Sequence, residues 1–567
     1  MGSSPLIDEG RASLAVTGRA LRGRAVGVQA RGTVLVRDVD LEVRPGELCA
    51  VIGASGSGKS TLLRVLAGVN APSSGSVSVG EEPIWSCTDA VGYVPTGDLV
   101  HPQLTVREAL AYAAALRVHD VPAAERAARV EEVLDELHMT ARGDHQVRSL
   151  SDGERRRVAC GTELVGRPSV LVLDEPTTGL DPGLERRLML LLRELADRGL
   201  AILASTHATG SLTLCDRIAV MGPGGRVVFS GSHDEVLRHF GASSIDEVYT
   251  AVAQPLTEAP GPLRAVSAES PDAPVRRRGL PPASAQVRTL ASRYALCLAR
   301  DPRSLALMIG QAPLIGIAIG LTVPSRILSD AVLGPFYGVL LAFMLVVGAV
   351  WLGLITACRE IARERDALYR EVAVGVRLDS YLLSKCVVLF PLIAFQILLL
   401  VIAVAVLQPP DGPASQYLGV LAVCVVAGWG SAAIGLLVSA AVRNPGQATT
   451  ALPLVVIPQF LLAGALIPPS QMIDPVRLLS DMTLSRWALS GIGGSLDLGA
   501  GISSELRTAT GLEGSFFADG VGRPLLMIAL LSVVTLFLAA IVLDRRVTAA
   551  VYDEYDEIPT TRHDTTN

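Results

Sequence analysis

Hydrophobic positions divide this chain into two parts with different patterns. Short apolar runs separated by polar turns fill the first 250 residues or so, whereas the long uncharged runs lie almost entirely after residue 303. Short runs bounded by turn residues predict the buried strands of an α/β domain. Long uncharged runs predict membrane helices, because about 20 residues at about 1.5 Å each cross the roughly 30 Å hydrocarbon layer. The expected fold is therefore an α/β domain followed by an all-α membrane domain.

Three strands and a helix can be placed in the α/β part. Residues 34–43 alternate apolar and polar side chains, as a half-buried strand does. Residues 48–52 and 170–173 are short apolar runs typical of buried strands. A glycine-rich segment follows residue 52, and we expect a helix over residues 60–67 directly after it. Strand, glycine loop and helix thus follow one another.

The uncharged runs predict six transmembrane helices. Five of them are 20 residues or longer, and the remaining one, at residues 449–467, is interrupted by Pro453 and Pro458, which membrane helices tolerate. The expected spans lie near residues 304–323, 331–357, 386–407, 416–442, 449–467 and 524–543.

Basic residues predict how these spans are oriented. They gather before the first span, between the second and third, and after the sixth, whereas loops 324–330 and 408–415 hold a single arginine, Arg326. By the positive-inside rule both termini are cytoplasmic, and the long segment 468–523 faces outward. The basic residues that set this orientation are Arg288, Arg293, Arg300, Arg303, Arg359, Arg363, Arg365, Arg370, Arg377, Lys385, Arg545 and Arg546.

Composition agrees with a membrane portion and excludes one class of partner. Of the 567 residues 50% are hydrophobic and only 18% are charged, which is unusual for a soluble protein. The formal net charge of -6 gives no sign of a nucleic-acid surface, so we expect no DNA or RNA partner. The eight cysteines form no C-x-x-C pair, and free thiols are expected.

Candidate chemistry begins at a lysine. Arginine supplies all but two of the 49 Lys and Arg side chains, and Lys59 is one of the two lysines. It lies in Gly-Ala-Ser-Gly-Ser-Gly-Lys-Ser at residues 53–60, which matches the phosphate-binding pattern G-x-x-x-x-G-K-[ST]. Backbone N–H groups of such a loop surround phosphate oxygens, and a compact ammonium fits inside it better than a planar guanidinium. We therefore expect this loop to bind a nucleoside triphosphate.

A second motif supplies two carboxylates. The apolar run 170–173 ends in Asp174 and Glu175. We expect Asp174 to bind Mg2+, directly or through water, together with the hydroxyl of Ser60, and Glu175 to polarise the attacking water as a general base. A glycine loop alone occurs by chance in unrelated chains, but both motifs in this order favour a hydrolytic nucleotide site.

Three further motifs complete a known pattern. They are Leu-Ser-Asp-Gly-Glu-Arg-Arg-Arg at residues 150–157, Gly-Leu-Asp at 179–181 and Ser-Thr-His at 205–207. With them, the first domain resembles the nucleotide-binding domain of ATP-binding cassette (ABC) proteins. The resemblance implies ATP and Mg2+ as cofactors, a D-loop at Asp181, and a catalytic switch histidine, His207, at the γ-phosphate. The alternative for His207 is an ordinary histidine after a strand. The alternative for the three arginines at 155–157 is a solvated helix face.

The resemblance also implies two larger sets of residues. The nucleotide-binding set is Gly53, Ala54, Ser55, Gly56, Ser57, Gly58, Lys59, Ser60 and Thr61. The signature set, which caps ATP bound by the opposite domain, is Ser151, Asp152, Gly153 and Glu154. Because the family closes each site with the signature of a second domain, the chain is expected to be a half-unit that pairs with itself or with a similar partner.

Two departures from the family pattern affect the expected rate. Thr96 stands at the Q-loop position, where a glutamine normally contacts Mg2+ and the attacking water, and its side chain cannot reach as far. No aromatic residue precedes Val34 where the family stacks adenine, and Gln29 and Arg31 stand there instead. We expect slower or less tightly coupled hydrolysis than in a full consensus site.

The membrane half sharpens the resemblance. Residues 351–385 read WLGLITACREIARERDALYREVAVGVRLDSYLLSK and residues 293–309 read RYALCLARDPRSLALMI. With the ATPase first and six spans after it, the chain resembles White-type, or G-subfamily, half-transporters, especially bacterial ones. The resemblance implies a coupling helix at residues 359–371, although an ordinary charged loop with i,i+4 pairs is the alternative. We place the ATPase domain at 1–252, a Pro-rich linker at 253–287, the permease at 288–546 and a cytoplasmic tail at 547–567.

The expected function is ATP-driven export of a hydrophobic or amphipathic small molecule or lipid across a bacterial cell membrane by a dimer. The alternatives are a weakly hydrolysing or regulatory subunit of a heterodimer, and a membrane-tethered nucleotide sensor. Import is disfavoured because no binding-protein domain is present, and a soluble cassette protein acting on ribosomes is disfavoured by the six spans. Three glutamines in the spans either line a substrate path or bond neighbouring helices: Gln311, Gln396 and Gln459.

Overall fold

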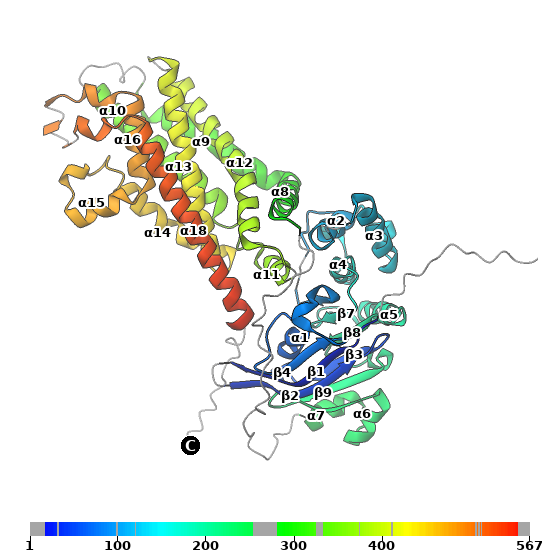
Figure 1. The fold of residues 1–567 in the computed structure, drawn as a ribbon. Coiled ribbons are helices and arrows are strands. Elements are labelled where there is room, and N and C mark those ends of the chain that lie inside the picture. Colours follow the sequence, from blue (N-terminus) through cyan, green and yellow to red (C-terminus); the bar gives the residue numbers. More distant parts are fainter. Residues whose placement is uncertain are drawn as a thin grey trace, which may run out of the picture. The chain divides into compact units, whose positions relative to one another are not determined.

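The computed structural model forms two compact units (Figure 1). The first comprises residues 1–282, 370–376 and 549–567, and the second comprises 283–369 and 377–548. The described residues are 18–30, 33–97, 100–118, 121–252, 281–324, 333–373, 375–409, 412–504, 507–508, 511 and 513–553. Most of the expected linker, at 253–280, and most of the expected tail, at 554–567, lie outside them.

The strands of the first unit form two sheets within the described residues. The smaller has the order β2-β1-β4-β5, and the larger has the order β10-β9-β3-β8-β7-β6. In the larger sheet all strands except β10 run parallel to their neighbours. The strands are β1 (Leu21–Ala30), β2 (Thr33–Val43), β3 (Leu48–Gly53), β4 (Ser74–Val79), β5 (Glu82–Pro83), β6 (Val91–Val94), β7 (Val170–Leu173), β8 (Ala201–Ser205), β9 (Arg217–Gly222) and β10 (Arg226–Gly231).

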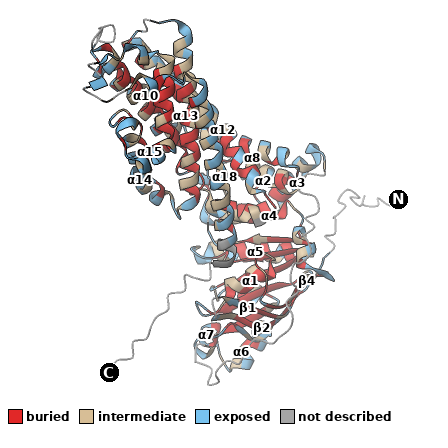
Figure 2. Ribbon diagram, turned by 60° about the vertical axis from the view of Figure 1, so that its left-hand side comes forward, coloured by how far each residue is buried: buried red, intermediate tan, exposed pale blue. Residues whose placement is uncertain are grey.

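Helices flank these sheets, and every residue of β3, β7 and β8 is buried (Figure 2). Complete burial is what parallel strands covered on both faces require, and it explains their continuous apolar runs. The strands expected at 34–43, 48–52 and 170–173 and the helix expected at 60–67 are confirmed to within one residue. The helices are α1 (Lys59–Leu66), α2 (Val106–Arg117), α3 (Ala123–Glu136), α4 (Asp152–Leu164), α5 (Pro182–Asp197), α6 (His233–Phe240) and α7 (Ile245–Val252).

The second unit is helical. Among the described residues five helices are long and apolar enough to cross a membrane: α9, α10, α12, α13 and α18. The remaining expected span, at residues 449–467, corresponds to α14, which has 17 residues and ends at Leu461. The helices are α8 (Ala283–Ala299), α9 (Pro302–Thr322), α10 (Gly334–Ala357), α11 (Arg365–Ala373), α12 (Leu378–Leu407), α13 (Ala414–Ala441), α14 (Pro445–Leu461), α15 (Asp474–Asp481), α16 (Leu484–Ser495) and α18 (Gly522–Asp553).

Segment 468–523 contains more structure than the long outward loop expected from the sequence. Helices α15 and α16 lie within it, and α16 packs against α10 and α13. Its apolar side chains, among them Leu484, Leu489 and Ile492, are buried. At 12 residues α16 is too short to cross the hydrocarbon layer, so a search for long uncharged runs does not find it.

Two of the three span glutamines bond neighbouring helices. The Nε2 of Gln396 donates to the Met308 carbonyl oxygen at 2.7 Å, and its Oε1 accepts from the Thr356 hydroxyl at 3.3 Å. The Oε1 of Gln459 accepts from the Ser485 N–H at 3.1 Å. These bonds satisfy amides that are buried, so for Gln396 and Gln459 the helix-bonding interpretation holds rather than the substrate path.

Lys385 occupies a different place from the one the sequence suggests. It is expected among the loop charges between the second and third spans, but it lies inside α12 and is only 1% exposed. Its Nζ lies 2.6 Å from the Glu364 carboxylate and 3.7 Å from the centre of the Tyr294 ring. The Tyr294 hydroxyl in turn donates to Glu360 at 2.7 Å. An ion pair between a buried ammonium and a half-buried carboxylate, with a cation–π contact, therefore joins α8, α12 and the residues just before α11.

Replacing this lysine tests the buried network. We expect Lys385→Met to destabilise the membrane domain by about 2–3 kcal/mol, because the half-buried Glu364 carboxylate would lose the ammonium that lies 2.6 Å away. Adding Glu364→Gln should restore part of that loss. The exposed Arg377–Asp379 pair at the start of the same helix is the matched control, and Arg377→Met should cost no more than about 1 kcal/mol. Denaturant unfolding in detergent measures all three variants, and equal losses for Lys385→Met and Arg377→Met would contradict the assignment.

Candidate functional site

The sheet order brings the sequence motifs together. Strands β3, β8 and β7 are consecutive neighbours in the larger sheet and run parallel, so their carboxyl ends lie at one edge. The glycine loop follows β3, Asp174 follows β7, and Thr206 and His207 follow β8. Ligands of open α/β sheets bind outside the carboxyl ends of the strands. The candidate site therefore lies at this edge.

The glycine loop connects β3 to α1. Gly56 and Gly58 have φ angles of 79° and 93°, in the left-handed region that side chains with a Cβ avoid. The Nζ of Lys59 donates to the carbonyl oxygens of Gly53 at 2.9 Å and Ala54 at 3.1 Å, so the ammonium lies across the inside of the loop. Burial lowers the pKa of Lys59, and the nearby Glu175 and Asp174 carboxylates oppose that shift.

The other residues of the glycine loop differ in how far they are buried. Ala54, Ser55 and Gly56 are exposed at the tip of the loop, and Thr61 is half-buried in the first turn of α1. Ser57 is only 5% exposed, and its Oγ has no hydrogen-bond partner within the described chain. A buried hydroxyl without a partner is costly, and it fits a loop whose remaining partner is a ligand oxygen.

Asp174 is the buried carboxylate of the site. Its Oδ1 accepts from the Ser60 hydroxyl at 3.0 Å and from the Ser205 hydroxyl at 2.8 Å. Burial raises the pKa of Asp174, while these two hydrogen bonds lower it. Ser60 and Asp174 thus present two oxygen atoms side by side, the ligand type that Mg2+ prefers.

Glu175 and His207 face each other beside Asp174. The His207 Nε2 lies 3.0 Å from the Glu175 Oε1, and the Thr178 hydroxyl donates to the Glu175 Oε2 at 3.0 Å. Glu175 itself has a φ of 47°, a left-handed conformation that is uncommon for a residue with a Cβ. This turn comes directly after β7, at the sheet edge where Asp174 lies.

Ser205 is a functional residue that sequence reasoning missed. Its hydroxyl donates to Asp174 and accepts from the backbone N–H of Glu175 at 2.8 Å, so one side chain orients both acidic residues. The Ser-Thr-His motif contains Ser205, but only the histidine is given a role from the sequence. Without the strand order, nothing in the sequence shows that the end of β8 meets the end of β7.

The signature residues lie at the start of α4. The Ser151 side chain accepts from the Glu154 N–H at 3.3 Å and the Glu154 carboxylate accepts from the Ser151 N–H at 2.9 Å, which is a capping box. Asp152 pairs with Arg155, and Gly153 is buried beside Leu184. These contacts stay within or next to α4.

The D-loop residue Asp181 lies at the start of α5, whereas the Q-loop residue Thr96 lies after β6. Asp181 caps α5, since its Oδ1 accepts from the N–H groups of Gly183 and Leu184 at 2.9 Å each.

Thr96, at the Q-loop position, is exposed two residues after β6. The Val94 carbonyl oxygen at the end of this strand accepts from the Asp174 N–H at 2.8 Å. The next residue, Gly97, accepts from the Arg156 guanidinium at 2.8 Å, so this arginine is more than a solvated charge. Arg31, considered for adenine, lies outside the described residues.

Comparisons with known proteins agree with this geometry. Residues 36–178 match the family model described as ABC transporter, and residues 285–496 match the model described as ABC-2 type transporter. The chain is 33% identical over 516 residues to the ABC transporter ATP-binding/permease protein Rv1747 of Mycobacterium tuberculosis, covering 84% of this chain and 58% of that protein.

Two further relatives match over shorter lengths. The chain is 38% identical over 210 residues to ABC transporter G family member 21 of Arabidopsis thaliana, covering 35% of this chain and 31% of the relative. It is 34% identical over 235 residues to the Nod factor export ATP-binding protein I of Cupriavidus metallidurans, covering 41% and 77%. The chain spans less than two thirds of the length of the first two of these three relatives.

The position of Ser205 leads to a test of the site. We expect Ser205→Ala to lower the rate of ATP hydrolysis by about tenfold or more, because both acidic residues lose the hydroxyl that orients them. Ser211→Ala is the matched control, since Ser211 is equally buried but bonds Glu185. Phosphate release by purified protein measures both. If the two variants hydrolyse ATP at the same rate, Ser205 does not position the site.

Proposed function

This chain is an ABC transporter with an N-terminal ATPase domain and an ABC-2 type membrane domain, and we propose that it exports a hydrophobic or amphipathic molecule or lipid as a dimer. The observation that carries the proposal is that one chain joins a multi-pass membrane domain to an α/β domain in which Lys59, the Ser60–Asp174 pair and the Glu175–His207 pair meet at one sheet edge. The organisation is that of a G-family-like half-transporter.

Nucleotide binding falls to the glycine loop. Its backbone N–H groups and the Lys59 ammonium would hold the phosphates, and the buried Ser57 hydroxyl would gain the partner that the protein does not give it. Ser60 and Asp174 would hold Mg2+, which neutralises phosphate charge when bound. Their oxygens already share a hydrogen bond at 3.0 Å, which supports this assignment. The N-terminus of α1 adds a favourable positive potential at the same place.

Hydrolysis falls to Glu175 and His207. Glu175 would accept the proton of the attacking water, and His207 would orient that carboxylate and contact the γ-phosphate. The 3.0 Å contact between His207 Nε2 and Glu175 Oε1 supports a shared role. Thr178 holds the other carboxylate oxygen, so the general base is fixed from two sides.

The signature residues would act on a second chain. Half-transporters of this type dimerise, and Ser151 to Glu154 would close the ATP site of the partner, whose own signature closes this one. The capping box supports this role because it fixes the N-terminus of α4, a position where backbone N–H groups favour an anion.

Coupling would run through α11. This helix, Arg365–Ala373, lies within the segment 359–371 that the resemblance implies for coupling, apart from its last two residues. Within the first unit the Arg370 guanidinium donates to the Thr162 hydroxyl on α4 at 3.2 Å. Because α4 begins with the signature, closure of the ATP site would move the residues that hold Arg370.

Glu175→Gln separates an exporter from a nucleotide sensor. We expect the variant to bind ATP but to lose about 100-fold or more in hydrolysis, and with it vesicle uptake of a fluorescent lipid or drug, because the general base is gone. Glu194→Gln, which changes an exposed carboxylate, is the control and should retain both activities. A sensor that signals through bound ATP would instead keep its output in Glu175→Gln.

Thr96 is expected to limit the rate. Restoring the longer amide with Thr96→Gln should raise the rate of ATP hydrolysis several-fold, since the glutamine can reach the metal and the attacking water. Steady-state kinetics of the purified dimer give kcat and KM, and the gain should appear in kcat. A variant no faster than the natural protein would mean that the Q-loop side chain does not set the rate.

A further inference from the structure

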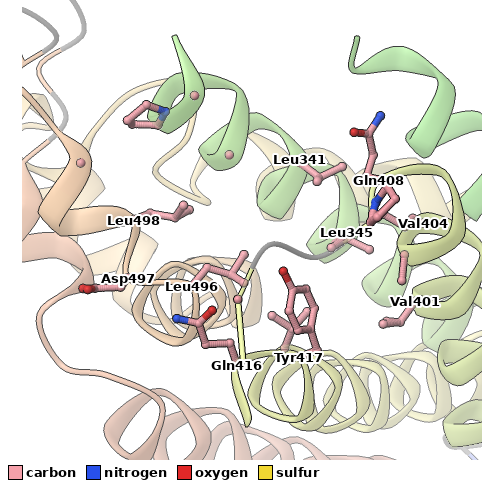
Figure 3. Close-up of a pocket in the computed structure, with 18 residues that line it drawn as sticks. Leu341, Leu345, Val401, Val404, Gln408, Gln416, Tyr417, Leu496, Asp497 and Leu498 are labelled. Atoms are coloured by element: carbon pink, nitrogen blue, oxygen red, sulfur yellow. The ribbon is translucent and has the colours of Figure 1, made fainter. Parts of the chain in front are cut away.

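A cavity of about 440 Å³ lies at the end of the membrane domain where α10 begins and α12 ends (Figure 3). It is bounded by the first turns of α10, the last turns of α12, the first turns of α13 and the short helix η8 (Leu498–Gly501). Its size is in the range of about 300–1,000 Å³ that small-molecule sites occupy. The basic residues of the chain predict that this end of the domain faces outward.

The cavity walls are mainly hydrocarbon. Leu341 and Leu345 of α10 lie beside Val401 and Val404 of α12, and Leu498 lies on the other side (Figure 3). These side chains come from elements that are distant in the sequence. A ligand held here would therefore contact α10, α12 and η8 at once.

The polar lining is almost entirely uncharged. Figure 3 shows the Tyr417 hydroxyl pointing into the cavity, with the Gln416 amide beside it on the same side. The Gln408 Nε2 donates to the carbonyl oxygens of Gly320 at 2.9 Å and Val323 at 2.7 Å, so this amide ties α12 to the end of α9. Asp497 is the one charged residue among those that line the cavity, and its carboxylate points away from the centre (Figure 3).

We propose that this cavity binds one uncharged amphiphile, with its hydrocarbon chain along the Leu and Val walls and its hydroxyl or ester carbonyl at Tyr417 and Gln416. Among the described residues that line the cavity there is no lysine or arginine to balance a buried carboxylate or phosphate, and an unpaired buried charge is costly. The one carboxylate among these residues, that of Asp497, points away from the centre, so an ammonium group would not meet it there (Figure 3).

Tyr417 and Gln416 determine which head group the cavity prefers. Lipid tails are as apolar as leucine, so contact with hydrocarbon walls alone does not draw a molecule out of the bilayer. Hydrogen bonds to Tyr417 and Gln416 supply an interaction that the bilayer interior lacks. Selection of an uncharged head group over a charged one therefore follows from these two side chains and from the lack of a cationic side chain in the described part of the lining.

Binding at this cavity is independent of the proposed function. The cavity is lined by one chain and needs neither ATP nor a second subunit to be occupied. The site therefore remains testable in the Glu175→Gln chain, in which hydrolysis is expected to be lost. Failure of export in vesicles and failure of binding at the cavity are separate outcomes.

The test uses the full chain in phosphatidylcholine nanodiscs. The probe is a monoacylglycerol that carries a diazirine in its acyl chain, and peptides labelled on irradiation are identified by mass spectrometry. We expect labels on the cavity turns of α10 and α12, with competition by unlabelled monoolein. Val404→Trp, which fills the cavity, should lower this labelling at least tenfold, whereas Val406→Trp, two residues away and 73% exposed, should not. Equal labelling of both variants would overturn the proposal.

Two further measurements separate recognition from misfolding. Tyr417→Phe keeps the ring and removes the hydroxyl, and we expect monoolein to compete several-fold less well in this variant while the elution volume of the protein is unchanged. In the natural chain, oleate at pH 8 and oleyltrimethylammonium should compete at least tenfold less well than monoolein. Unchanged competition in Tyr417→Phe, or equal competition by either ion, would contradict an uncharged ligand held by a polar pair.

Discussion

The ATPase half depends on one constraint, the side-by-side parallel order of β3, β8 and β7. Because these strands end at one edge, segments more than a hundred residues apart meet there, and Asp174 can accept hydrogen bonds from both Ser60 and Ser205. The same hydroxyl of Ser205 accepts from the Glu175 N–H, and the Glu175 carboxylate, the proposed general base, lies beside His207. Any change that separates these strands would separate the proposed metal ligands and the proposed base together.

The two lysines of the chain, one in each half, are both buried cations surrounded by acceptor groups. Lys59 and Lys385 are 6% and 1% exposed, so both are buried cations in a protein that otherwise uses arginine. A compact ammonium fits where several acceptors converge, inside a glycine loop or between a carboxylate and a tyrosine ring, whereas a planar guanidinium needs more room. Lys59 was interpretable from its motif. Lys385 was not, because its partners Glu364 and Tyr294 are brought to it only by helix packing.

Much of the fold could be predicted from the sequence because its signals are local. The apolar runs of β3 and β7, the glycine loop and the long spans each depend on neighbouring residues. The features that were missed depend on contacts distant in the sequence or on short elements. Ser205 acquires its role from strand order, α16 is too short to register as a span, and α14 ends at Leu461 although apolar residues continue beyond it.

We propose that each ATP site is divided between two chains, and a mixture of two defective chains tests this division. One chain carries Lys59→Ala in its phosphate loop, the other carries Gly153→Asp in its signature, and two affinity tags isolate the mixed dimer. Each variant alone should be inactive. If the sites are shared, the mixed dimer contains one intact site and should hydrolyse ATP at a substantial fraction of the natural rate. If each chain closes its own site, the mixed dimer has no intact site, and an inactive mixed dimer would contradict the account.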